Sequence, residues 1–428
     1  MKINKWTLGL AAVGLVSLAS VARAEEAKTV PLLTALSATT ISGYVDVSAV
    51  WNPGTGNANP APYAFNGGIA GVGGKQDGFN VNAISLTIAK PLEEGQWSSG
   101  YKVDLLYGPD AAAINSGGGV LGNGVNGPIR QAYVTLRAPV GNGLDFKIGQ
   151  FDNILGYESS DGYKNPNYTR SYGYTIEPTE HTGILAEYKV CDMVSLSGGV
   201  ANSVTTSFSN GRNISGRNGT GSGDYTIESK KALLAMVSLT APESWGWIGG
   251  SSLYAAVDYG PGFGANNNTG IPSNKTQWYI GTTMKTPLKA LTVGFAWDIV
   301  QDIETGGFAP AGPLAPGGTG YATTIAGYAS WKITDKASFH GRVEYGHGTG
   351  LSGLLAQGPL VGSTFRDDKV LAITGTFQYD LWQNVISRLE VRWDHSADGQ
   401  AHFGGVDVVS APTKKNDVMV AANFIYKF

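Results

Sequence analysis

The side chains that most often perform catalysis or hold metals are sparse in this chain. Its five histidines stand singly, and none has the i, i+4 spacing that lets two imidazoles on one helix hold zinc. His340 has no evident serine partner for a Ser–His hydrolase. Gly71-Val-Gly-Gly-Lys75 is similar to a phosphate loop, but Ile69 and Gln76 replace the Gly and the Ser or Thr that the motif needs. The sequence therefore predicts no enzyme, no metal site and no cofactor.

Charged residues gather instead in two sets, one in segment 152–180 and one in segments 336–346 and 386–396. In the second set the charges alternate with apolar residues, so they share one face of two predicted strands. Such sets can create an electric field across a water-filled channel, or they can form ion pairs among themselves. The first set is Asp152, Glu158, Asp161, Lys164, Arg170, Glu177 and Glu180, and the second is Arg342, Glu344, Arg388, Glu390, Arg392 and Asp394.

The elements that position these charges are strands. Sixteen segments alternate apolar and polar residues with a period of two, and their lengths are near the roughly ten residues of tilted membrane-spanning strands. Short turns such as 383–385 alternate with long loops such as 152–180 along the chain. The segments are 41–51, 79–91, 97–107, 129–139, 143–151, 181–190, 192–202, 229–241, 250–260, 275–287, 289–300, 319–333, 336–346, 368–382, 386–396 and 415–428.

The two faces of these strands indicate where they lie. In 386–396 one face carries Leu389, Val391 and Trp393, and the other carries the charges named above. An apolar outer face, a polar inner face, short periplasmic turns and long external loops are typical of bacterial outer-membrane barrels. Lipid offers no partner to an unpaired strand edge, so the sheet must close. We therefore predict an all-β fold, a single transmembrane antiparallel β-barrel of about sixteen strands, with both ends of the mature chain in the periplasm.

The two ends of the chain agree with export to the bacterial envelope. Lys2 and Lys5 precede an apolar run, and Ala22-Arg23-Ala24 supplies small residues for cleavage, so 1–24 is predicted to be a cleaved signal peptide. Residues 25–40 then form a short periplasmic lead-in, and 41–428 form the barrel. The last strand ends with aromatic residues on one face, which are Phe424, Tyr426 and Phe428.

Composition excludes other classes of protein. The chain has 30 basic and 33 acidic residues, so it lacks the basic excess that would indicate a nucleic-acid partner. After residue 24 no segment approaches the roughly 20 apolar residues of a membrane helix. Only 15% of the residues are charged, against about 25% in typical soluble domains. The single cysteine, Cys191, cannot form an internal disulfide.

Four segments resemble one protein family. Together, 39–51, 149–159, 165–174 and 177–188 resemble the OmpL-like β-barrel porin family of Gram-negative outer membranes. The resemblance implies a pore for small hydrophilic solutes, surrounded by outer-membrane lipid. In bacterial outer-membrane barrels the aromatic C-terminus is the signal that the barrel-assembly machinery reads. Many porins form homotrimers. The sequence is compatible with a homotrimer but does not require one.

Segment 152–180 follows the fifth strand, the position from which general porins fold a loop into the channel. One hypothesis is that it folds inward and sets the pore size and an acidic field. The other is that it closes over the rim with its charges in water. Arg342, Arg388 and Arg392 would face it from the opposite wall, eight strands away. They either form a ladder that faces the loop carboxylates or pair with the interleaved acids. In the second case Arg342 pairs with Glu344 or Glu390, and Arg388 or Arg392 pairs with Asp394.

The sequence therefore predicts a porin that lets small hydrophilic solutes diffuse passively across the outer membrane. Charges of both signs face the lumen, so we expect weak ion selectivity. Two alternatives remain open at this point. A substrate-specific channel, for example for sugars, would need an aromatic track in the lumen, whereas the tryptophans fall mostly on outward faces. A structural or adhesive barrel would have a blocked lumen and loops that bind partners.

Overall fold

The computed structural model describes residues 38–56, 60–61, 75, 77–113, 129–204, 231–261, 274–304, 319–349, 368–406 and 412–428. The predicted signal peptide, 1–24, and most of the predicted lead-in lie outside these residues.

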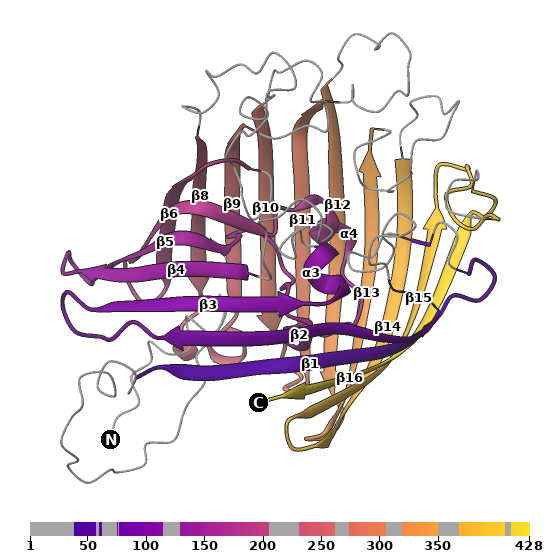
Figure 1. Cartoon of the computed structure of the whole chain (residues 1–428), viewed down its shortest axis with the longest axis horizontal. Helices are drawn as coiled ribbons and strands as arrows, with labels where there is room; N and C mark the ends of the chain where they lie inside the picture. The colour runs from indigo at the N-terminus through magenta and orange to yellow at the C-terminus, as the bar shows by residue number, and fades with distance from the viewer. Residues whose placement is uncertain are drawn as a thin grey trace.

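The described chain forms sixteen strands that pair in sequence order and close into one antiparallel barrel (Figure 1). The predicted sixteen-stranded antiparallel barrel is confirmed. The strands are β1 (Thr40–Trp51), β2 (Gly78–Lys90), β3 (Ser99–Tyr107), β4 (Ile129–Ala138), β5 (Leu144–Asp152), β6 (Glu180–Lys189), β7 (Val194–Ala201), β8 (Ala232–Thr240), β9 (Ser252–Pro261), β10 (Asn274–Lys285), β11 (Leu291–Glu304), β12 (Thr319–Lys332), β13 (Ala337–Gly348), β14 (Asp368–Trp382), β15 (Val385–Ser396) and β16 (Asn416–Lys427).

Strand β16 closes the barrel by pairing with β1, as the sequence predicted for the last strand. The register runs from Tyr44 opposite Lys427 to Trp51 opposite Val420. Phe428 continues this pairing, because its backbone N–H donates to the Gly43 carbonyl and its carbonyl accepts from the Gly43 N–H, each at 3.0 Å. The aromatic end of the chain therefore lies within the seam that removes the last free edge of the sheet.

Residues on the strands alternate between an apolar outward face and an interior face. On β15, Leu389 and Val391 are 55% and 50% exposed, whereas the neighbouring Glu390 and Arg392 are fully buried. Exposed tryptophans stand near strand ends, for example Trp51 at the end of β1 and Trp382 at the end of β14. This is the outward apolar band with aromatic edges that an outer-membrane barrel needs.

The connection between β14 and β15 is a tight turn. Gln383 and Asn384 alone join β14 to β15, and Asn384 has a φ of 64°. Asparagine tolerates this left-handed conformation better than most residues, because its short polar side chain can bond to the local backbone. Such a turn fixes the register of the hairpin that presents the charged face of β15 to the interior.

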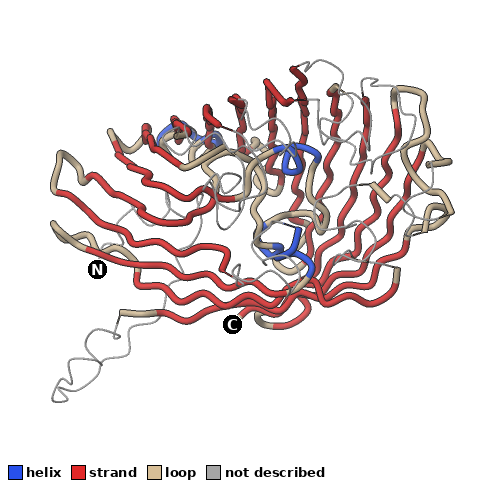
Figure 2. Tube along the Cα trace, turned by 45° about the horizontal axis from the view of Figure 1, so that its top comes forward, coloured by secondary structure: helices blue, strands red, loops and turns tan. Residues whose placement is uncertain are grey.

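The helical segments are short: α3 (Pro109–Ala113), η2 (Gly162–Lys164), α4 (Tyr172–Ile176) and η5 (Glu243–Ile248). Among the described residues, no helix has both the length and the apolar character needed to cross a membrane. Ser171 caps α4, because its hydroxyl accepts a hydrogen bond from the Tyr174 N–H at 3.1 Å. In Figure 2 helical and loop segments lie inside the ring of strands.

The closing seam leads to a first prediction. A Cβ at position 43 would collide with the Ser85 carbonyl oxygen and stand 2.6 Å from Cζ of Phe428. Gly43→Ala should therefore destabilise the barrel by about 1–3 kcal/mol, as overpacking does. Urea unfolding in lipid vesicles, followed by tryptophan fluorescence, measures this loss. Gly327→Ala is the matched control, since a Cβ there meets nothing within 4 Å. Equal stability of the two variants would contradict the prediction.

Candidate functional site

The segment between β5 and β6, residues 153–179, lies against the far wall of the barrel; we call it the inner loop. The Thr169 N–H donates to the Glu390 carboxylate on β15 at 2.9 Å, and the Tyr172 hydroxyl donates to Asp394 at 2.9 Å. Strand β15 lies across the closed ring from β5. The inner loop therefore reaches across the interior, where Figure 2 shows loop and helix inside the ring of strands.

The inner loop is first bound to itself. The Asn165 side-chain amide bonds to the Ser159 backbone on both sides, accepting from its N–H at 2.8 Å and donating to its carbonyl at 2.7 Å. The Arg170 guanidinium donates to the backbone carbonyls of Ser159, Tyr168 and Ser160 at 2.9, 3.0 and 3.1 Å. Arg170 is only 1% exposed. It acts as an internal brace of the loop, a role that its sequence position did not indicate.

Arg342 on β13 fastens this braced loop to the wall. Its guanidinium bonds to Glu344 on its own strand at 2.6 Å and to Glu158 of the inner loop at 2.8 Å. It also donates to the Thr169 carbonyl at 2.8 Å. All three charged side chains are at most 1% exposed in these pairs. Removing one partner of such a group would leave a buried charge unpaired, so the group holds the loop in place only as a whole.

Arg392 and Arg388 on β15 extend the same contact. Arg392 pairs with Asp394 at 2.9 Å, donates to the Arg170 carbonyl at 2.7 Å and lies over the Tyr172 ring. Arg388 donates to the carbonyls of two loop residues, Gly162 and Asn165. Backbone carbonyls carry only partial charge, so they satisfy Arg388 without neutralising it. The loop thus meets the arginines of β15 with its own carbonyl groups.

These contacts decide between the arrangements that the sequence left open for the arginines. Arg342 forms both kinds of contact, because it pairs with the loop carboxylate of Glu158 and with the wall acid Glu344. The wall pair of Arg392 with Asp394 is present. The alternative pair of Arg388 with Asp394 is wrong, because Arg388 is directed to loop carbonyls instead. The arginines touch the loop directly, so no open water separates them from it.

A second charged group ties the start of the inner loop to the near wall. Arg130 on β4 donates to Asp152 at 2.7 Å and Asp104 at 2.9 Å, and lies 3.3 Å from Asp161 of the loop. Burial would raise the pKa of Asp161, but Arg130 and Lys164 together hold that pKa below its usual range. Asp161 therefore stays ionised and bound to the wall.

The alternation pattern missed Arg130, because an irregular register between β3 and β4 disturbs it. The pairing shifts between Asp104 and Leu105, and both Arg130 and Gln131 face the interior side by side. Strict alternation would send one of these two residues outward. The sequence shows only that Arg130 is a basic residue near the start of a predicted strand, and that alone does not indicate a buried ion pair.

The end of the inner loop carries two further acids predicted from the sequence. Glu180, the first residue of β6, is 1% exposed and accepts from the Thr179 hydroxyl at 3.3 Å. The carboxyl of Glu177 lies beside the carboxyl of Asp298 on β11. Burial and the neighbouring Asp298 raise the pKa of Glu177 well above its usual range.

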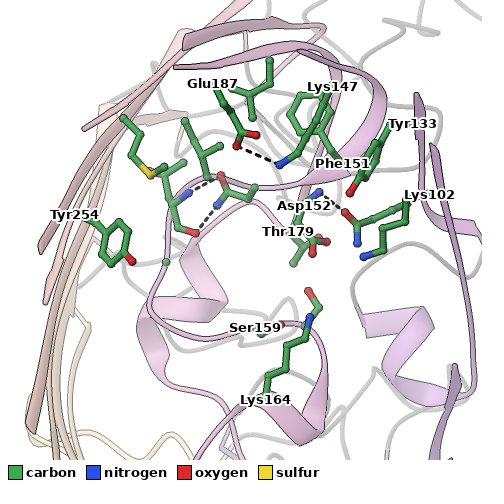
Figure 3. A pocket seen from close by; sticks show the side chains of 18 of the residues that line it. Lys102, Tyr133, Lys147, Phe151, Asp152, Ser159, Lys164, Thr179, Glu187 and Tyr254 are labelled. Carbon is green, nitrogen blue, oxygen red and sulfur yellow. Dashed lines mark hydrogen bonds and ion pairs between the residues drawn. The ribbon is translucent and has the colours of Figure 1, made fainter. Parts of the chain in front are cut away.

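A cavity of about 920 Å³ remains on the other side of the inner loop, between the loop and the strands from β1 to β6 and from β8 to β10. Its wall includes Lys102, Tyr133, Lys147 and Tyr254, and the inner loop contributes Lys164. In Figure 3 the three lysines lie around one space, and Tyr254 stands across it. Each lysine has an acidic partner: Asp104 at 2.9 Å, Glu187 at 3.1 Å and Asp161 at 2.7 Å, in chain order. The described wall is mixed, and its polar groups include charges of both signs.

The histidines require one correction. The sequence showed no serine partner for His340, but its ring nitrogens lie 2.8 Å from the Ser330 hydroxyl and 2.9 Å from that of Ser338. Ser338 lies two residues away on the same strand face, and Ser330 stands opposite on β12. No acid bonds to this ring among the described contacts, so the group lacks the third member that orients a catalytic histidine. The described residues also hold no group of three or more metal-ligating side chains.

A closed barrel with an apolar outside, a polar interior and an inner loop after the fifth strand defines a porin-like protein of the outer membrane. The family model described as "Putative beta-barrel porin-2, OmpL-like" matches residues 38–428. The chain belongs to this family, and its recognition from the sequence is confirmed.

Solved structures share the fold at low sequence identity. The outer-membrane channel DcaP of Acinetobacter baumannii is 13% identical, with a TM-score of 0.53 over 91% of this chain and 97% of that one. An anion-selective porin from Comamonas acidovorans is 10% identical, with a TM-score of 0.52 over 91% and 99%. OmpT of Vibrio cholerae in its trimer form has the same identity, TM-score and coverage of both chains as the Comamonas porin. No curated protein matches the sequence.

The buried anchor on β13 leads to a second prediction. Arg342→Met should destabilise the barrel by about 3–5 kcal/mol, because Glu158 and Glu344 would stay buried without their nearest cation. Urea unfolding in lipid vesicles measures the loss. The control is Arg137→Met, whose pair with Asp145 is partly exposed and should contribute at most about 1 kcal/mol. A loss in Arg342→Met no larger than in the control would contradict the anchoring role.

Proposed function

We propose that this protein forms a water-filled channel for passive diffusion of small hydrophilic solutes across the outer membrane. The observation that carries the proposal is the cavity of about 920 Å³ inside a closed barrel, with charged and polar groups in its wall. A barrel of sixteen strands is wide enough to leave an aqueous path beside an inner loop. Membership of a porin family supports the same conclusion.

The inner loop is proposed to set the size of the path. Its contacts with β13 and β15 fix one side, and its residues Ser159 and Lys164 line the cavity on the other. A loop held by buried ion pairs keeps one position, which a fixed size limit requires. Solutes would then pass between the loop and the strands that carry Lys102, Lys147 and Tyr254.

Two other functions remain as alternatives. A sugar channel is favoured by the tyrosines of the cavity wall, since Tyr101, Tyr133 and Tyr254 offer ring faces and hydroxyls to a solute. A non-conducting structural or adhesive barrel is favoured by the complete burial of Arg342 and Arg392, which shows how much of the interior is filled. Conductance in planar bilayers separates the second alternative from any pore.

The setting of this channel is also a proposal. We propose that 1–24 is removed on export, that both ends of the mature chain lie in the periplasm, and that the assembly machinery reads Phe424, Tyr426 and Phe428. The pairing of β16 with β1 supports this, because insertion of the last strand completes the barrel. A homotrimer is compatible with the fold, since OmpT of Vibrio cholerae has a trimer form.

Deletion of 158–172 tests the role of the inner loop. This stretch carries the contacts to Arg342, Arg388 and Arg392, so its loss should open the interior and raise the single-channel conductance. Folding of the variant is verified by its resistance to SDS before heating. If a folded deletion variant conducts as the wild type does, the loop does not set the pore size.

Substitution of one lysine in the cavity wall tests whether ions pass through this cavity. Lys147→Gln removes a positive charge from the cavity wall and leaves Glu187 without its partner, so the reversal potential in a salt gradient should shift toward cation preference. Lys332→Gln is the matched control, because Lys332 is highly exposed at the end of β12 and pairs with Asp335 in a turn. The proposed path is wrong if both variants keep the wild-type potential.

A further inference from the structure

The end of the inner loop meets the wall through two acidic groups. Glu177 directly follows α4. Its backbone N–H donates to the Gly173 carbonyl at 3.2 Å, and its carboxyl lies beside the carboxyl of Asp298 on β11. Two ionised carboxylates side by side repel each other, so this arrangement favours a proton held between the pair. Glu177 is half-buried and lines the cavity, whereas Asp298 is 2% exposed, so the cavity gives the proton a route to water.

The loop backbone is shaped around this pair. A Cβ at Gly156 would collide with the Glu177 carboxylate, and a Cβ at Gly173 would stand 2.6 Å from Oδ2 of Asp298. Both limbs of the inner loop therefore pack against one or the other carboxyl. A change in the distance between the two carboxyls would have to displace at least one limb.

Charged groups around the pair do not neutralise it. Glu158 of the loop is already paired with Arg342 on β13, at 2.8 Å. Asp258 on β9 already binds His181 on β6, also at 2.8 Å. The tyrosines Tyr279 on β10 and Tyr328 on β12 also pack in this region. Within the described part of the chain, no lysine, arginine or histidine forms an ion pair with Glu177 or Asp298.

We propose that the Glu177–Asp298 pair is a proton-controlled latch that holds the end of the inner loop against β11. When the proton leaves, two adjacent carboxylates repel, and Glu177 moves toward the cavity because the strand behind Asp298 is fixed. This consequence for the channel rests on the proposed function, whereas the latch itself does not.

The direction of the pH dependence follows from the raised pKa of Glu177, which burial and Asp298 cause. The packed loop favours the protonated acid, so the stabilisation is complete below the ordinary glutamate pKa of about 4.3. It is lost as the pH rises through the raised value. Asp161 acts in the opposite sense at the other end of the loop, where its lowered pKa stabilises packing until the pH becomes strongly acidic.

Hydrogen exchange of segment 153–179 tests the latch without any need for conduction. As the pH is raised from about 5 to about 9, protection of this segment from exchange should fall more in the wild type than in Glu177→Gln. Glutamine keeps a donor for Asp298 and cannot ionise, so its loop should stay packed. Glu187→Gln, in the cavity wall beside Lys147, is the control and should keep the wild-type pH response.

Infrared spectroscopy supplies a second readout. Near neutral pH the wild type should show a protonated-carboxyl band that Glu177→Gln lacks and Glu187→Gln retains. The latch is refuted if this band is the same in the wild type and Glu177→Gln, or if loop protection follows pH equally in both. A barrel that shows both effects but conducts no ions would refute the proposed channel and leave the latch intact.

Discussion

Closure of the sheet is the constraint on which the rest of this structure depends. Lipid cannot bond to a free strand edge, so β1 must pair with β16, and Phe428 completes the seam through its two backbone bonds to Gly43. Closure turns every polar strand face toward one interior. It thereby brings Arg342 and Arg392 into a space with low access to water, where each charge needs a partner.

The inner loop provides those partners. Its carbonyl groups and Glu158 satisfy the guanidinium groups, while Glu390 on the wall receives two of the loop's N–H groups. The interior is thus divided in two. One side is a dense polar contact between loop and wall, and the other is the cavity beside Lys102, Lys147 and Tyr254. The same contacts that satisfy the buried charges also give the loop one position, which is what a size-selective passage needs.

Much of this could be predicted from the sequence, because the period-two alternation is a local property of each strand. It predicted the charged face of β15 and the pairing of the last strand with the first. It could not predict that the Arg388 side chain meets Gly162 and Asn165, since those contacts join residues more than 220 positions apart. Arg130 was missed because a local shift of register reverses its face, and the serines beside His340 were missed although one of them shares its strand face.

Solute permeation through the wild-type protein tests the central claim most directly. The claim is that the cavity beside the inner loop is part of a continuous aqueous path. Purified protein in liposomes should admit small sugars at rates that fall as sugar size increases, and in planar bilayers it should give steady ion conductance. A folded barrel that neither admits the smallest sugar nor conducts ions would contradict the claim and favour a structural or adhesive role.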